Sequence, residues 1–304
     1  MIGAGCAGKL VQRGRRNALL ISAYLGIIGT AITVWENYAC IIAGRLLYGF
    51  SVGIIAIAMP RIMEETVPLN LVGFYAGLYC LSFAAATLFA YMFAIFLPPD
   101  DDTSALKTTH VTNIIFGLPI LFYLLQLLIQ YTYFTRDTPK FLLLSSKKPE
   151  AMLEIGKIYS RANNPDDQEE IVKHMFKNVQ KQTATITVKD AFCSRAYRSG
   201  SAVSLFIMSL HELTAINGIM LYSNTILKDI GGPITPRKGT YIIGVINFLS
   251  SCCSLYAAKA FSRRFLFIGG HFLMGLSHIA IGYFIMIDKG IYAIVGILVF
   301  LFAF

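Results

Sequence analysis

Charged residues are scarce in this sequence. Only 14% of its 304 residues are Asp, Glu, Lys or Arg, whereas 56% are hydrophobic. A soluble domain normally carries about 25% charged residues, and the mean hydropathy of this chain is +0.62. The composition therefore excludes an ordinary water-soluble protein and predicts that the chain lies in a membrane.

The sequence also lacks the signatures of catalytic and metal sites. It contains no GxxxxGK[ST] loop and no arrangement of a nucleophile with a base. Its six cysteines form no CxxC pair and no Cys/His ligand spacing. We therefore expect no enzyme activity, no cofactor and no metal ion. Residues 1–16 have no apolar core followed by a cleavage site, so no signal peptide is expected either.

Long hydrophobic runs are abundant. A helix that crosses a bilayer needs about 20 apolar residues. Five runs carry no charge, namely 17–34, 69–97, 111–134, 239–258 and 265–287. Runs 38–60 and 199–227 are apolar apart from Arg45 and the His211–Glu212 pair, and 290–304 is a shorter apolar run. The sequence thus predicts an all-α membrane protein with roughly eight transmembrane helices.

The net charge of +9 is distributed unevenly along the chain. If every apolar run crosses once, 9–17, Arg61, 135–198 and 259–264 share one side and hold 20 of the 26 Lys and Arg residues. By the positive-inside rule this side is cytoplasmic, in the plasma membrane or an endomembrane. No basic stripe interleaved with aromatic residues occurs, so we expect the lipid bilayer, and no nucleic acid, as a partner.

The long polar segment 135–198 separates two apolar parts, which suggests membrane halves at 1–134 and 199–304. The segment itself predicts cytoplasmic helices over 147–161 and 163–182. The second of these has acidic residues near its start and lysines in its later turns, as the helix dipole prefers. We therefore interpret it as a solvated helical linker.

An internal repeat relates the two parts. RGRRNALLIS (13–22) is similar to FSRRFLFIGG (261–270), and each Arg-Arg pair opens an apolar run from the same side. Parallel repeats of this kind relate the two six-helix halves of some transporters. Because two apolar runs precede the second pair but none precedes the first, we expect an incomplete copy, with about eight of twelve helices present.

Four segments resemble one family in its order along the chain. GKLVQRGRR (8–16), GRLLYGFSVG…PRIMEETVP (44–68), TRDTPKFLL (135–143) and HELTAINGIMLYSNTIL (211–227) are similar to motifs of the sugar porters. This family of the major facilitator superfamily includes glucose-type facilitators and proton–sugar symporters. The resemblance implies two pseudo-symmetric helical halves that move a hexose or similar sugar by alternating access, by facilitation or with proton coupling.

The resemblance also implies substrate-binding residues. His211 and Glu212 stand where the family has two glutamines that bind sugar hydroxyls, and Asn217 and Asn247 match family asparagines that contact substrate. Tyr222 keeps one aromatic residue of a family pair. Buried sugar hydroxyls need such paired donors and acceptors. Two plainer interpretations stay open, a polar pair at a water-filled rim and hydrogen bonds between helices.

Arg45 is a charge inside a predicted spanning helix. Such a charge costs about 2.5–3.5 kcal/mol on insertion scales, so it should face the bundle interior. The proton-coupled members of the family pair this arginine with an acid on their first helix, which implies a role in proton coupling. The alternative is an arginine that reaches the outer interface.

Other charged residues match the family's inner gate, whose ion pairs favour the outward-open state. The gate residues implied by the resemblance are Arg13, Arg15, Arg16, Glu65, Asp137, Lys140, Arg263 and Arg264. Cys80 departs from the family by replacing a sugar-binding glutamine, and Lys259 replaces an acid. His211, Glu212 and Cys80 keep open a carrier of an organic acid, an inositol or a cation. The missing helices keep open a non-transporting sensor or defective fragment.

Overall fold

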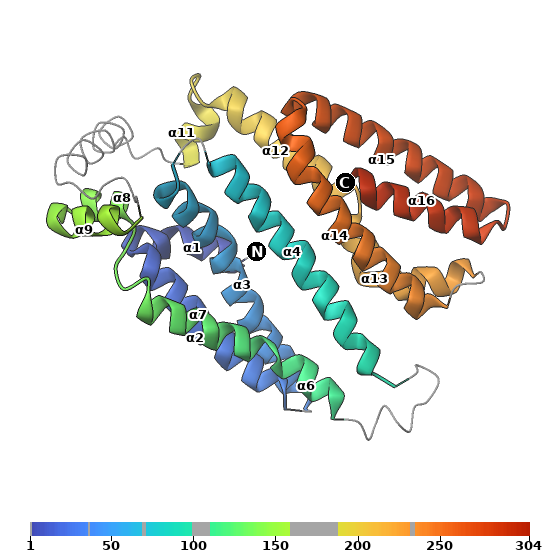
Figure 1. Cartoon of the computed structure of the whole chain (residues 1–304), viewed down its shortest axis with the longest axis horizontal. Helices are drawn as coiled ribbons and strands as arrows, with labels where there is room; N and C mark the ends of the chain where they lie inside the picture. The colour runs from blue at the N-terminus through green and yellow to red at the C-terminus, as the bar shows by residue number, and fades with distance from the viewer. Residues whose placement is uncertain (1, 36, 69–70, 99–109, 159–187, 232–234) are drawn as a thin grey trace. The chain divides into compact units, whose positions relative to one another are not determined.

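The computed structural model describes residues 2–35, 37–68, 71–98, 110–158, 188–231 and 235–304 (Figure 1). Every regular element within these ranges is a helix. The chain divides into two compact units. The first contains residues 1–76 and 96–185, and the second contains residues 77–95 and 186–304. The membrane halves at 1–134 and 199–304 stay a prediction.

The helices of each unit follow in chain order. The first unit holds α1 (Ile2–Arg13), α2 (Arg15–Thr33), α3 (Tyr38–Thr66), the start of α4 (Val72–Phe93), α6 (Val111–Gly117), α7 (Pro119–Thr132), α8 (Pro139–Leu144) and α9 (Lys148–Ile158). The second unit holds the rest of α4, α11 (Val188–Cys193), α12 (Arg198–Leu213), α13 (Ile216–Ile230), α14 (Pro236–Ala260), α15 (Arg263–Met286) and α16 (Gly290–Ala303). A short 3₁₀ helix, Ala94–Phe96, extends α4.

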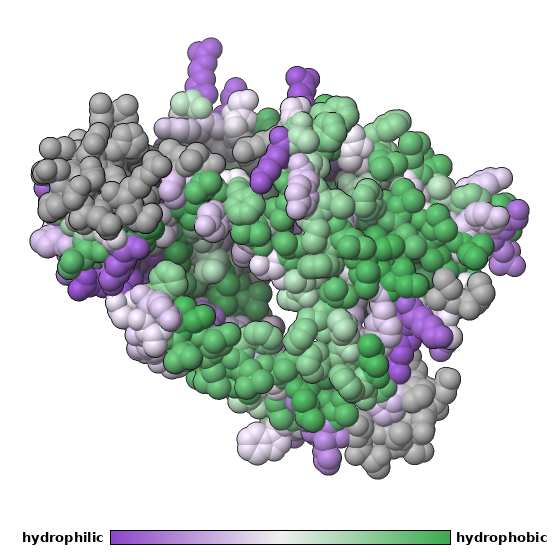
Figure 2. Space-filling view, in the orientation of Figure 1, coloured by the Kyte–Doolittle hydropathy of each residue, from purple (hydrophilic) through white to green (hydrophobic). Residues whose placement is uncertain are grey.

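Long apolar helices dominate the described residues. Seven segments could cross a membrane by length and composition, namely 15–33, 38–66, 72–96, 111–132, 198–230, 236–260 and 264–286. The apolar helix α16 is shorter, with 14 residues. Large side chains such as Phe83 and Ile279 are 72% exposed, and Figure 2 shows apolar surface over these helices. Such surface suits lipid rather than water, so the predicted multi-pass membrane protein is confirmed.

The predicted linker helices are described only in part. The helix expected over 147–161 is confirmed as α9, which places Pro149 in its first turn, where a missing N–H does no harm. The helix expected over 163–182 lies outside the described residues.

Glycine permits close contact between α2 and α3 in the first unit. A Cβ on Gly29 would lie 2.6 Å from the backbone nitrogen of Tyr48, and one on Gly44 would lie 2.6 Å from the carbonyl oxygen of Gly29. Ser51 of α3 also donates to the carbonyl oxygen of Ser22 at 2.7 Å. Small residues and buried hydroxyls of this kind bind helices together in membranes, where the hydrophobic effect adds little.

The second unit has its own apolar core where α13, α14, α15 and α16 meet. Its buried residues are Ile216, Leu227, Ile243, Met274, Ile294, Ile297, Phe300 and Leu301. Gly244 of α14 lies under the ring of Tyr91 from α4, and the Tyr91 hydroxyl donates to the carbonyl oxygen of Met220 in α13. These contacts hold residues 77–95 against α13 and α14 within the second unit.

Candidate functional site

A buried ion pair joins the start of α2 to the end of α3. Arg15 and Glu65 are each only 5% exposed. The guanidinium of Arg15 donates from Nε to Oε2 of Glu65 at 2.9 Å and from Nη2 to Oε1 at 2.7 Å. Arg61 donates to Oε1 at 3.1 Å and the Thr138 hydroxyl to Oε2 at 2.6 Å. Each carboxylate oxygen therefore accepts two hydrogen bonds, which offsets the cost of burying the charge.

Arg15 is positioned on all sides. Its Nη1 donates to the carbonyl oxygen of Val11 in α1 at 3.2 Å, and its guanidinium lies 4.6 Å from the centre of the Phe141 ring in α8. A guanidinium against an aromatic face keeps its hydrogen-bond fork in a fixed plane. The single pair of Arg15 and Glu65 therefore ties α1, α2, α3 and α8 together.

Asp137 caps α2 from a distant part of the chain. The N-cap residue Gly14 has no side chain, and Oδ1 of Asp137 instead accepts the backbone N–H of Arg16 at 2.8 Å. Gly14 has φ of +150°, and a Cβ there would lie 3.0 Å from Oδ2 of Asp137. An acidic group at a helix start also meets the positive end of the helix dipole. Glycine at position 14 therefore leaves room for the carboxylate.

The structure brings four of the predicted gate residues together: Arg15 with Glu65, and Arg16 with Asp137. All four lie in the first unit. Lys140 is half-buried on α8, three residues beyond Asp137. Arg13, the last residue of α1, is exposed and forms no ion pair within the described part of the chain.

The last two predicted gate residues belong to the second unit. Arg263 begins α15, and the side chain of Arg264 is exposed. Whether they act with the first unit stays a prediction.

Sequence reasoning missed Arg61, Thr138 and Glu154, three residues of the first unit that contact charged side chains. Arg61 precedes Glu65 by one helical turn, a spacing that favours an ion pair. Thr138 precedes Pro139, a pattern typical of a helix start, and the structure shows it as the N-cap of α8. Glu154 of α9 lies 3.7 Å from Arg136 and 3.0 Å from Lys157. The Glu154–Lys157 pair also has a local signal in its i,i+3 spacing, whereas the Arg136–Glu154 contact depends on how the chain before α8 packs on α9.

Arg45 has an aromatic neighbour. Its guanidinium lies 4.9 Å from the centre of the Phe116 ring, and the residue is exposed. Both line a cavity of about 140 Å³ together with Thr30, Thr33 and Tyr48. Among the described residues no carboxylate forms an ion pair with Arg45, so the expected role in proton coupling stays a prediction.

A helix break in the second unit separates α12 from α13. Ala215 has φ of +58°, a left-handed conformation that a non-glycine residue rarely adopts. Across the break the side-chain amide of Asn217 donates to Oε2 of Glu212 at 3.1 Å. His278 of α15 donates from Nε2 to the carbonyl oxygen of Thr214 at 3.1 Å, which fixes the tautomer, because a carbonyl only accepts.

The structure thus joins two of the five predicted substrate-binding residues. Glu212 and Asn217 are exposed polar groups beside an interrupted helix. The ring of His211 lies 5.0 Å from that of Phe304. Tyr222 is 60% exposed, and Asn247 is half-buried in α14. Within the described chain neither Tyr222 nor Asn247 is hydrogen-bonded to Glu212 or Asn217. His278 was missed, since nothing in the local sequence connects it with residue 214.

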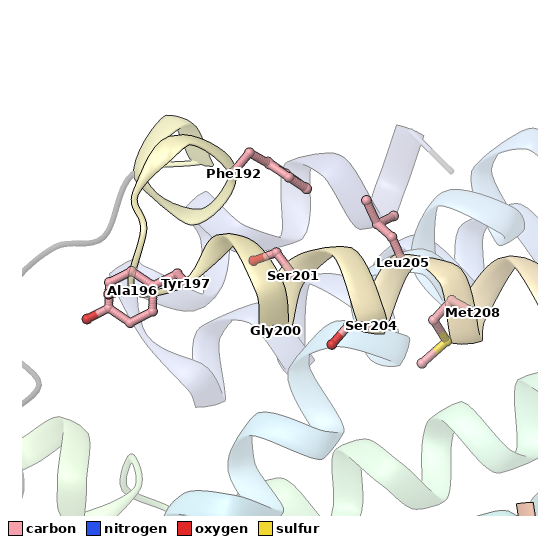
Figure 3. A pocket seen from close by; sticks show the side chains of 8 residues that line it. All are labelled: Phe192, Ala196, Tyr197, Gly200, Ser201, Ser204, Leu205 and Met208. Atoms are coloured by element: carbon pink, nitrogen blue, oxygen red, sulfur yellow. The ribbon is translucent and has the colours of Figure 1, made fainter.

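A shallow groove of about 560 Å³ lies between α11 and α12. Figure 3 shows Phe192 of α11 on the same side of α12 as Ser201 and Leu205, while Met208 projects to the other side. No charged residue lines this groove. It offers hydroxyl groups and apolar surface, without the converging polar groups of a specific site.

No candidate metal site occurs among the described residues. The described ranges contain no cluster of three His, Cys, Asp or Glu side chains. The six cysteines are all free thiols.

The whole sequence, residues 1–304, matches the family model described as sugar (and other) transporter. The chain belongs to this family. The predicted membership and the prediction that the chain is not an enzyme are therefore confirmed. The contacts of Arg15, Glu65 and Asp137 described above are therefore those of a member of a transporter family.

Curated relatives carry related names. Hexose transporter 1 of Plasmodium vivax (strain Brazil I) is 23% identical over 276 residues, which cover 89% of this chain and 55% of the relative. Facilitated glucose transporter member 3 of solute carrier family 2 is 27% identical over 278 residues in Canis lupus familiaris, covering 89% of this chain and 53% of the relative. The sheep (Ovis aries) protein of that name is 28% identical with the same coverage. The chain thus spans about half the length of these relatives.

Solved structures agree on the fold. A structure titled as the major facilitator proton:xylose symporter XylE bound to 6-bromo-6-deoxy-D-glucose superposes with a TM-score of 0.83 at 21% identity. The match covers 100% of this chain and 66% of that one. A partially occluded inward-open structure of the E. coli protein gives 0.80 at 20% identity, covering 100% and 70%. The predicted all-α major facilitator fold is confirmed.

Proposed function

We propose that the protein carries a hexose or a similar sugar across a membrane by alternating access. The observation that carries this proposal is the family match over residues 1–304, together with relatives named as hexose and glucose transporters. The residues that would bind the sugar are His211, Glu212, Asn217, Tyr222 and Asn247. The break between α12 and α13 supports the assignment, because interrupted helices in transporters expose polar groups to substrate.

Glu212 and Asn217 provide complementary hydrogen-bonding chemistry. The carboxylate accepts, while the amide offers two donors and an acceptor. Their mutual hydrogen bond of 3.1 Å leaves free capacity on both side chains. Two neighbouring hydroxyls of a pyranose need this combination, since a hydroxyl left unpaired on binding lowers affinity.

Glu65 and its partners Arg15, Arg61 and Thr138, here called the Glu65 cluster, would serve the inner gate as a rigid element. It connects α1, α2, α3 and α8 through charge-assisted hydrogen bonds that are largely buried. A rocking motion of two bodies requires each body to keep its shape. We therefore assign Arg15, Glu65 and Asp137 to holding the basic end of the first unit together while access alternates.

Orientation and coupling are part of the same proposal. The positive-inside rule assigns the basic segments, including 135–198, to the cytoplasm of the plasma membrane or an endomembrane. Arg45 is the candidate for proton coupling. Uptake that rises with an imposed inward proton gradient would support coupling, and uptake unaffected by the gradient would assign facilitated transport.

The binding step can be tested on the full chain in nanodiscs. Equilibrium binding of glucose, xylose, myo-inositol and citrate is compared for the wild type, Asn217→Ala and the control Thr225→Ala, an exposed polar residue of the same helix. We expect saturable hexose binding that Asn217→Ala weakens about 5- to 150-fold, the equivalent of about 1–3 kcal/mol, and that Thr225→Ala leaves unchanged. Binding of citrate or inositol without any sugar would refute the proposal.

A further inference from the structure

The first unit contains a larger cavity than the one beside Arg45, and it lies apart from the helix break at Ala215. Its volume is about 610 Å³, within the range of pockets that bind small molecules. It lies among α2, α3, α7, α8 and α9. Its wall is mostly apolar, formed by residues such as Leu19, Ile62, Phe122, Leu125 and Ile129. The apolar chemistry of the wall suits a hydrocarbon chain.

One end of this cavity is polar and carries excess positive charge. Arg15, Arg16, Arg136 and Lys157 line it, against the two carboxylates of Asp137 and Glu154. Because Arg15 is already paired with Glu65, the other three cations exceed the two carboxylates by one charge. An anionic group is the ligand that this balance favours.

Within the described part of the chain, two of these arginines have donors left for a ligand. Arg16 donates from Nε to the carbonyl oxygen of Phe134 at 2.7 Å, but its Nη2 reaches the carbonyl oxygen of Gln130 only at 3.5 Å. Arg136 lies 3.7 Å from Glu154, longer than a hydrogen bond. A guanidinium has five N–H donors, so both side chains can bind a further oxygen. Arg15 cannot serve in this way as readily, because Glu65 and Val11 take its donors.

A buried amide lines the same cavity. Gln130 is 4% exposed, and its Oε1 atom has no hydrogen-bond partner among the residues that the structure describes. A buried polar atom without a partner is rare in native structures and calls for an explanation. Because the two ends of an amide can exchange, Gln130 can donate to a ligand oxygen or accept from a ligand hydroxyl.

We propose that this cavity binds a single-chain amphiphile with a carboxylate head, such as a free fatty acid. The head group lies against Arg16, Arg136 and Gln130, and the chain extends along Ile129, Leu125 and Leu19. A planar carboxylate matches the two-pronged donor geometry of arginine. One apolar pocket of this volume accommodates one chain, which separates a fatty acid from a two-chain phospholipid. This site does not depend on the proposed sugar transport.

The test uses the full chain in nanodiscs of zwitterionic lipid and a photoreactive lauric acid probe. Saturable labelling should map to residues 119–139. Unlabelled laurate should compete for it, whereas dodecanol and glucose should not. In a series from octanoate to laurate, each added CH₂ should improve competition about fourfold when compared at equal free aqueous concentration, because one more methylene leaves water.

Variants separate this site from general partition into lipid. Arg136→Gln and Gln130→Leu should each weaken laurate competition at least about fivefold. The control Lys9→Gln removes a charge from an exposed residue of α1 and should leave laurate competition unchanged. Labelling that does not saturate, equal competition by dodecanol, or equal labelling of Arg136→Gln and wild type would each overturn the proposal. Competition by glucose would do so as well, because it would assign the cavity to the sugar path.

Discussion

Replacing Glu65 with glutamine tests the buried ion pair directly. Glutamine keeps the shape of the side chain but removes its charge and replaces one acceptor oxygen by a donor NH₂ group. In the structure each carboxylate oxygen of Glu65 accepts two hydrogen bonds, and the donors are Arg15, Arg61 and Thr138. The new NH₂ group would face these donors, and Arg15 would stay buried without a counter-charge.

The magnitude follows from this geometry. Removing one partner of a buried pair costs about 3–5 kcal/mol. At about 2–4 °C per kcal/mol for a domain of 150–250 residues, Glu65→Gln should lower the melting temperature by about 6–20 °C. Glu64 is the adjacent exposed carboxylate, and Glu64→Gln should stay within about 0.5 kcal/mol of wild type.

Thermal unfolding in detergent, followed by fluorescence-detected size-exclusion chromatography, measures both variants. The double variant Arg15→Met/Glu65→Leu provides a further check, because replacing both charges by apolar groups removes the uncompensated charge. It should be more stable than Glu65→Gln. If Glu65→Gln melts at the same temperature as Glu64→Gln, the Arg15–Glu65 pair does not hold α2 and α3 together.

Three further predictions concern helix ends. Gly14→Ala should destabilise the protein by about 1–3 kcal/mol, because the φ of Gly14 is +150° and a Cβ there would crowd Asp137. The melting temperature should fall, and an unchanged melting temperature would contradict the cap geometry. Asp137→Ala should cost about 0.5–2 kcal/mol and Asp137→Asn less, since asparagine still accepts the N–H of Arg16; equal effects in the same assay would assign the contribution to charge alone. His278→Phe should weaken hexose binding by about 5- to 10-fold, because it removes the donor to Thr214 at the helix break; unchanged affinity in the nanodisc assay would separate His278 from the site.

Much of the fold could be predicted from the sequence, because its signals are local. Every spanning helix appears as a run of about 20 apolar residues, and lipid imposes helices on such runs. Resemblance to a family indicated Arg15, Arg16, Glu65 and Asp137 as gate residues. Only the structure shows which of them pair, since 50 and 121 residues separate the partners.

Other features could not be predicted because they arise from packing. The cap that Asp137 provides for α2 has no local signature, since Gly14 is the N-cap residue by position. The contact of His278 with Thr214 joins residues 64 positions apart. The left-handed conformation of Ala215 has no sequence signal either, because alanine is the strongest helix former. The cavity beside Gln130 depends on five helices at once, and no pattern in one segment describes it.

Equilibrium counterflow tests the central claim most directly. Vesicles containing the full chain are loaded with unlabelled glucose and diluted into a trace of labelled glucose. A hexose carrier that works by alternating access exchanges the two, so the label should accumulate transiently inside and then decline, and Asn217→Ala should slow this exchange. Label that never rises above its equilibrium level, in vesicles whose protein still binds hexose, would contradict transport by this chain.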